Sequence, residues 1–233
     1  MVHLYVMFVV NDISWTSSCG ASIITARHVL TAAHCVVSNG IVVRPENLEM
    51  ILAKHDRDKP TGKEITIKAE RVFVRDIYLQ KGLSFHDIAV IFTKETIDFS
   101  TPLVGPICVE KEEYPIINRR INIMGWGLTE NYVASPFLRK SKARVMDPII
   151  CGGRAWDVCT MTSISSTCNG DSGGPLVWLD KETNRYSQIS LVSRGSEKCR
   201  GKQSISTLVA YFYDWIQEII SDTDPSVQTC HKI

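Results

Sequence analysis

Apolar residues gather in short runs along the chain, and polar or turn-forming residues separate most of them. Runs at residues 48–52, 65–67 and 72–74 have the length and β-branched content typical of strands. Both alternating sets of residues are apolar at positions 1–10, which predicts a strand buried on both faces. The same stretch lacks the basic start and small-residue cleavage site of a signal peptide. Further strands are expected at residues 19–24, 29–30 and 88–92.

The last long apolar segment has a different period. Residues 211–220 place apolar side chains at helical spacing, which predicts a helix near the C-terminus. Many short strands followed by one helix indicate an all-β fold.

Composition narrows the functional classes. A chain of 233 residues can bury a large core, as one domain or as two closely packed halves. A net charge of +1 gives no reason to expect a nucleic acid or an anionic membrane as partner. No apolar run approaches the ~20 residues that span a bilayer. Eight cysteines without a zinc-type C-x-x-C pair favour a disulfide framework in an oxidising, secreted environment.

One stretch organises the chemistry of the chain. Residues 168–175 read Cys-Asn-Gly-Asp-Ser-Gly-Gly-Pro, which places Ser172 on a glycine-lined turn. Such a turn can expose a serine hydroxyl and direct the backbone N–H groups of Gly170 and Ser172 into one small space. A nucleophile that attacks a carbonyl needs both features. The alternative is an ordinary Gly/Ser/Asp turn between strands.

Two upstream segments supply partners for that serine. His34 lies in Leu-Thr-Ala-Ala-His-Cys, and a neutral imidazole is the usual base for a serine hydroxyl. Asp87 opens an apolar strand in His-Asp-Ile-Ala-Val, where a buried carboxylate can orient an imidazole. Taken singly, His34 could be a packed or surface histidine and Asp87 a cap at a strand end.

The three segments together, in the chain order His, Asp, Ser, resemble the trypsin/chymotrypsin family of serine proteases. Subtilisins and α/β-hydrolases carry these groups in other orders, which argues against a lipase or esterase on another fold. The resemblance implies two six-stranded antiparallel β-barrels with the site in the cleft between them, followed by a C-terminal α-helix. Residues 1–233 would form one protease domain, with the N-terminal barrel at about 1–112 and the C-terminal barrel and helix at about 113–233.

The resemblance also implies residue roles. Ser172 would be the nucleophile, His34 the base and Asp87 the group that orients the base, and Gly170 and Ser172 would form the oxyanion hole. The implied partners are protein or peptide substrates and protein inhibitors, with no cofactor, nucleic acid or membrane. A lysine, Lys54, stands roughly where relatives place the first calcium-binding carboxylate, so we expect no metal.

The family pattern pairs six of the cysteines. It implies the disulfides Cys19–Cys35, Cys151–Cys159 and Cys168–Cys199. Cys108 and Cys230 are left over. They pair with each other, or Cys108 ties the domain to an upstream propeptide or regulatory domain.

The same alignment suggests the substrate pocket. Its floor would be Ser166, where trypsin-like relatives carry an aspartate, so we expect an uncharged residue before the cleaved bond. Its walls would be Ser193, Arg194, Gly195 and Ser204. Relatives usually carry tryptophan at the Arg194 position. This arginine narrows the cleft, attracts an acidic substrate residue, or turns out to solvent.

Asp171 raises a question about activity. In the family, this residue pairs with an α-ammonium group that activation cleavage creates, and residues 1–10 begin without the Ile-Val-Gly-Gly segment that supplies it. We expect a zymogen-like or truncated catalytic domain, in which the loop relaxes until Asp171 finds water or another donor. The first functional hypothesis is a secreted endopeptidase that is cut from a larger precursor or acts in a proteolytic cascade. The alternative is a non-catalytic or zymogen-like homologue that acts as a binding module.

Overall fold

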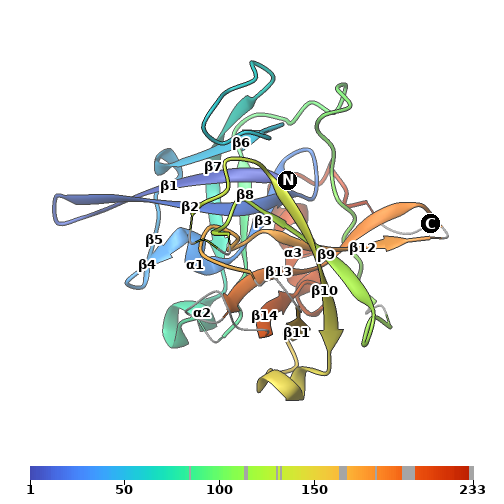
Figure 1. Cartoon of the computed structure of the whole chain (residues 1–233). Coiled ribbons are helices and arrows are strands. Elements are labelled where there is room, and N and C mark those ends of the chain that lie inside the picture. The colour runs from blue at the N-terminus through green and yellow to red at the C-terminus, as the bar shows by residue number, and fades with distance from the viewer. Residues whose placement is uncertain are drawn as a thin grey trace.

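The computed structural model describes the chain except residues 84, 113–114, 130, 132, 163–166, 182, 196–202 and 231–233. Two closed antiparallel barrels of six strands each make up most of it, and a short helix follows them (Figure 1). This confirms the expected fold class. No helix among the described residues is long and apolar enough to cross a membrane.

The first barrel is formed by the N-terminal strands. Its strands follow the order β1-β2-β3-β8-β7-β6 around the barrel. They are β1 (Val2–Val10), β2 (Ile13–Ile23), β3 (His28–Thr31), β6 (Leu48–Leu52), β7 (Ile65–Val74) and β8 (Ala89–Thr93). The connecting elements are α1 (Ala33–Val36), β4 (Val37–Ser38), β5 (Ile41–Val42), η1 (Pro45–Asn47) and α2 (Asp76–Lys81).

The prediction that β1 is buried on both faces is wrong for its second half. Val2 and Leu4 are fully buried, whereas Met7 and Val9 are 41% and 52% exposed. β1 pairs with β6 only over residues 3–6, and beyond them it pairs with β2 alone. The two strands therefore continue as a hairpin that projects from the barrel (Figure 1), and one of its faces lies in solvent.

The two short strands expected at residues 65–67 and 72–74 are one continuous strand, β7. Its pairing with β8 shifts register between Ala69 and Arg71, which marks a β-bulge. Lys68, Glu70 and Arg71 point to solvent, so polar residues interrupt the apolar pattern without interrupting the strand.

The second barrel follows in the chain. Its strands lie in the order β10-β11-β14-β13-β12-β9. They are β9 (Arg120–Gly125), β10 (Arg139–Met146), β11 (Asp157–Met161), β12 (Pro175–Asp180), β13 (Arg185–Gly195) and β14 (Gln203–Leu208). The remaining elements are η2 (Pro148–Cys151), η3 (Ala210–Phe212) and α3 (Tyr213–Thr223), the last of which confirms the expected C-terminal helix.

The C-terminal helix returns to the first barrel. Ile216, Ile219 and Ile220 of α3 belong to the same buried cluster as the residues of β1, β3 and β8. A hydrogen bond of 2.7 Å between His28 Nε2 and Thr223 Oγ1 links β3 to the helix. Because α3 follows the second barrel in sequence and packs on the first, it ties the two halves together.

Three disulfides join described cysteines. They are Cys19–Cys35, Cys108–Cys230 and Cys151–Cys159. Cys108 and Cys230 are thus partners of each other in this structure. The predicted pair Cys168–Cys199 cannot be placed, since Cys199 lies outside the described residues.

The Cys108–Cys230 disulfide should contribute more to stability than the Cys151–Cys159 disulfide. Their cysteines are 122 and 8 residues apart in sequence. In the chain-entropy treatment, loops of these lengths contribute about 5 and about 2.5 kcal/mol. Replacing both cysteines of each pair by serine should lower the free energy of urea unfolding by these amounts. Equal losses in the two variants would show that loop length does not set the contribution.

Candidate active site

His34 is held against Asp87 by two hydrogen bonds. Its Nδ1 lies 2.8 Å from Asp87 Oδ2, and its backbone N–H donates to Asp87 Oδ1 at 2.9 Å. The residue lies in α1, directly after β3, and the Cys19–Cys35 disulfide anchors its neighbour in the chain. The imidazole is 24% exposed and the carboxylate 1% exposed, so one end of the ring faces out of the protein.

Asp87 accepts a third hydrogen bond, which sequence reasoning did not predict. The hydroxyl of Ser193 donates to Asp87 Oδ2 at 2.6 Å, although Ser193 was expected only as a wall of the substrate pocket. The hydroxyl of Thr207 donates to the backbone carbonyl of Asp87 at 2.9 Å. Both oxygens of the carboxylate are thus occupied as acceptors, and the contact with the His34 ring is an N–H group donating to Oδ2. The proton on the His34 ring therefore sits on Nδ1, and Nε2 is left as an acceptor.

The electrostatics of His34 follow from this contact. Burial lowers the pKa of the imidazole, but the charge of Asp87 and the hydrogen bond to it outweigh that effect. The pKa of His34 is raised above its ordinary value as a result. Such a histidine accepts a proton more readily than an isolated one.

The loop that carries Ser172 is fastened to both barrels. The N–H of Gly20 donates to the carbonyl of Ser172 at 2.7 Å, and the N–H of Gly173 donates to the carbonyl of Val192 at 2.8 Å. Gly173 has a φ of +71°, and a Cβ atom there would overlap Thr31 Oγ1. This glycine is required both by its backbone conformation and by the close approach of the His34 segment.

These contacts bring the three predicted segments together. Gly173 lies against Thr31, three residues before His34, and its acceptor Val192 adjoins Ser193, which binds Asp87. No hydrogen bond joins the Ser172 hydroxyl to the His34 ring in the part of the chain that the structure describes. Such contacts often tighten only when a substrate is bound.

Two backbone donors beside Ser172 have no acceptor among the described residues. The N–H groups of Gly170 and Ser172 make no hydrogen bond there, whereas those of Asp171, Gly173 and Gly174 all do. Gly170 adopts a φ of +97°, a conformation that favours glycine. Two unengaged donors on one turn can bind a small anion or a developing oxyanion.

Asp171 finds donors in the backbone. Its carboxylate accepts hydrogen bonds from the N–H groups of Gly127 at 2.9 Å and Cys168 at 3.0 Å. It lies against Gly125 and Gly127, where a Cβ atom would overlap its oxygens. Burial raises the pKa of Asp171, and the two hydrogen bonds offset this only in part.

The predicted pocket walls meet on neighbouring strands. Gly195 of β13 is paired directly with Ser204 of β14, and Thr167 Oγ1 donates to Ser204 Oγ at 2.8 Å. The buried Ser204 is thereby fixed beside Gly195. The predicted floor residue, Ser166, lies outside the described residues.

Arg194 does not turn out to solvent. Its guanidinium forms an ion pair of 2.8 Å with Asp157 Oδ2, and its side chain is only 22% exposed. The N–H of Arg154 donates to the same oxygen at 3.0 Å. Asp157 was missed by sequence reasoning, although a lone aspartate at the start of an apolar strand is a signal for a buried ion pair.

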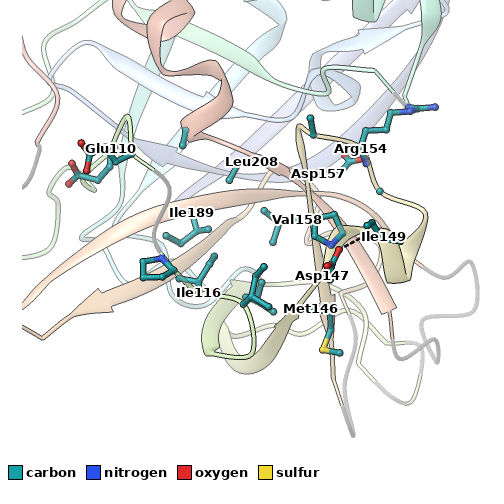
Figure 2. A pocket seen from close by; sticks show the side chains of 18 of the residues that line it. Glu110, Ile116, Met146, Asp147, Ile149, Arg154, Asp157, Val158, Ile189 and Leu208 are labelled. Carbon is teal, nitrogen blue, oxygen red and sulfur yellow. Dashed lines mark hydrogen bonds between the residues drawn. The ribbon is translucent and has the colours of Figure 1, made fainter.

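Asp157 also lines a cavity of about 730 Å³ in the second barrel (Figure 2). Its walls are mostly apolar, and Ile116, Val158 and Ile189 are among them. None of His34, Asp87 and Ser172 lines this cavity. It is therefore separate from the site described above, and Asp157 lines it while it pairs with Arg194.

Comparison with known proteins agrees with this geometry. Residues 5–216 match the family model described as Trypsin. The chain is 28% identical to venom serine protease 34 of Apis mellifera, 32% to the proclotting enzyme of Tachypleus tridentatus and 29% to chymotrypsin-C of Bos taurus. These matches cover 91%, 86% and 89% of the chain but 53%, 58% and 80% of those relatives. The chain thus spans little more than half of the first two, and it belongs to the trypsin family of serine proteases.

Proposed function

We propose that the chain is a serine endopeptidase in which His34, Asp87 and Ser172 form the catalytic triad. The observation that supports this most strongly is the contact between His34 and Asp87, which leaves Nε2 as an acceptor on the partly exposed side of the ring. The Ser172 loop is hydrogen-bonded to strands beside that segment, and two of its N–H groups have no acceptor among the described residues.

The reaction would begin with attack of Ser172 Oγ on the carbonyl carbon of a peptide bond. His34 Nε2 takes the serine proton, and the N–H groups of Gly170 and Ser172 bind the oxyanion that forms. The C–N bond then breaks, and the same proton passes from His34 to the leaving amine. Water hydrolyses the acyl-enzyme by the reverse sequence of proton transfers. Asp87 keeps the imidazole in the required tautomer throughout.

The substrate residue before the cleaved bond is proposed to be uncharged. Among the described residues next to Gly195, Thr167 and Ser204 offer hydroxyl groups rather than a carboxylate. A substrate cation would lie unpaired there at a high cost in free energy. Arg194 is held by Asp157, so its charge is largely neutralised and its side chain narrows the cleft rather than attracting an acidic residue.

The wider setting is also a proposal. Three disulfides between described cysteines suit an oxidising environment, and two relatives are named as a venom protease and a proclotting enzyme. We infer a secreted protease of a proteolytic cascade, with protein substrates and protein inhibitors as partners.

One observation favours a second candidate, a non-catalytic or zymogen-like homologue that acts as a binding module. The Ser172 hydroxyl makes no hydrogen bond to His34 in the described part of the chain. Labelling the purified chain with a fluorophosphonate separates the two candidates, since the reagent reacts only with an activated serine. Stoichiometric phosphonylation at Ser172, located by mass spectrometry, supports the endopeptidase. An unlabelled chain that binds a protein partner supports the module.

The pH dependence of ester hydrolysis should reflect His34. The base must be neutral to accept the serine proton, so activity falls as pH drops through its pKa. Because the pKa of His34 is raised, the acidic midpoint of kcat/KM should lie above the ordinary histidine value of about 6.5. A midpoint below that value would contradict the proposed effect of Asp87 on His34.

A further inference from the structure

The second barrel carries an unusual concentration of positive charge. Residues 115–146 contain six Lys or Arg residues and one acidic residue, a surplus of five positive charges. The whole chain has a net charge of +1, so all other residues together carry a net charge of −4. The positive charge is therefore local, and the net charge of the chain conceals it.

Paired strands gather these cations on one outward face. Lys140, Lys142 and Arg144 alternate along β10 and are exposed, whereas Ala143 and Val145 between and beyond them are buried. Alternate residues on a strand lie about 7 Å apart on the same face. Arg120 of β9 is exposed and is paired directly with Arg144. We call Arg120, Lys140, Lys142 and Arg144 the basic face.

None of the four has an acidic partner among the described residues. The ion pairs found there involve other residues. Like charges directly opposite on neighbouring strands, such as Arg120 and Arg144, repel each other and destabilise the sheet. An external anion would relieve this repulsion.

The basic face adjoins a cavity. Lys140 lines a cavity of about 660 Å³ together with Asn122 and Met124 of β9 and Arg185 of β13. Arg185 is exposed and adds a further cation to the cavity wall. The cationic positions thus extend across adjacent strands, which suits a long anion better than a single small one.

We propose that the basic face binds a linear sulfated polysaccharide. Sulfate groups spaced along a flexible chain can each meet one exposed Lys or Arg. Proteins that bind single-stranded nucleic acid stack successive bases on several aromatic side chains. The outward positions of β9 opposite Lys142 and Lys140 are Asn122 and Met124, and the cavity adds one exposed aromatic residue, Tyr186. No large apolar side chain of β9 or β10 is exposed for insertion into a membrane.

The test measures binding of a fluorescent heparin decasaccharide by anisotropy at about physiological salt. The variant Lys140→Gln/Lys142→Gln/Arg144→Gln should bind at least about tenfold more weakly than the unmodified chain. The matched control Lys59→Gln/Lys63→Gln/Lys94→Gln removes three exposed cations elsewhere, so the net charge changes equally. It should change the affinity less than about twofold.

Several results would overturn the proposal. They are absence of heparin binding, an equal loss in both triple variants, and tighter binding of the unmodified chain to DNA of equal charge or to phosphatidylserine vesicles. Heparin affinity of the unmodified chain should also fall steeply as salt rises, a measurement that needs no variant. Fluorophosphonate labelling is unaffected by either triple variant if the face is separate from the proposed active site.

Discussion

Replacing Ser172 by alanine should abolish hydrolysis of a chromogenic ester and of peptides. The substitution removes the oxygen that would form the acyl-enzyme, and His34 and Asp87 cannot replace it. In serine proteases, loss of the nucleophile lowers kcat by about 10⁶-fold. The rate acceleration that remains comes from the oxyanion donors and from substrate binding. Steady-state kinetics at saturating substrate measure the loss directly.

The variant should remain folded, because the hydrogen bonds that hold the Ser172 loop are made by backbone groups. Gly20 bonds to the carbonyl of residue 172, and that carbonyl is unchanged by the substitution. Ser221→Ala, at an exposed position of α3, is the matched control and should keep full activity. Hydrolysis that survives in Ser172→Ala would come from another nucleophile, and it would remove the basis for the proposed triad.

Periodicity predicted segments of each strand of the first barrel, whereas the second barrel was expected from the family resemblance. All five residues of β8 are buried because both faces of this strand are covered, whereas β6 alternates buried and partly exposed residues. Prediction failed where a strand leaves the barrel or carries polar residues outward. Met7 and Val9 are apolar on an exposed hairpin, and β7 continues through charged residues. Neither outcome is encoded locally, because each depends on which neighbouring strand supplies hydrogen bonds.

In the candidate site, too, local sequence indicated some features, and contacts between distant strands set the others. His34, Asp87 and Ser172 lie in short motifs, and the sequence indicated them once the three motifs were considered together. The contacts that hold them come from distant strands. Ser193 is 106 residues from Asp87, and it donates to that carboxylate because the fold brings β13 of the second barrel to the residue that precedes β8.

The ion pair of Arg194 could not be predicted from position alone. Its partner Asp157 lies 37 residues earlier, on β11. Arg194 lies at a position of the substrate-pocket wall where relatives carry tryptophan, and a buried arginine needs a counter-charge. The sequence contains several carboxylates that could supply it, so it does not identify the partner. Only the arrangement of β11, β14 and β13 in the barrel brings Asp157 into reach.

Replacing Asp87 by asparagine should lower kcat by about 10⁴-fold at neutral pH, with little change in fold. The backbone N–H of His34 donates to Oδ1, so the amide oxygen of asparagine must take that place. The NH₂ group then faces His34 Nδ1 and makes that nitrogen the acceptor. The ring proton moves to Nε2, which can no longer accept the proton of Ser172.

A second readout distinguishes this positioning role from a merely structural one. Without the negative charge, the pKa of His34 falls, so the acidic midpoint of the remaining activity should move to lower pH. Ser193→Ala removes only one donor to the carboxylate and should leave both the tautomer and most of the activity intact. If Asp87→Asn kept activity within tenfold of the unmodified chain and left the midpoint unchanged, Asp87 would not orient the base. The proposed proton transfer from Ser172 to His34 would then need another partner on Nδ1.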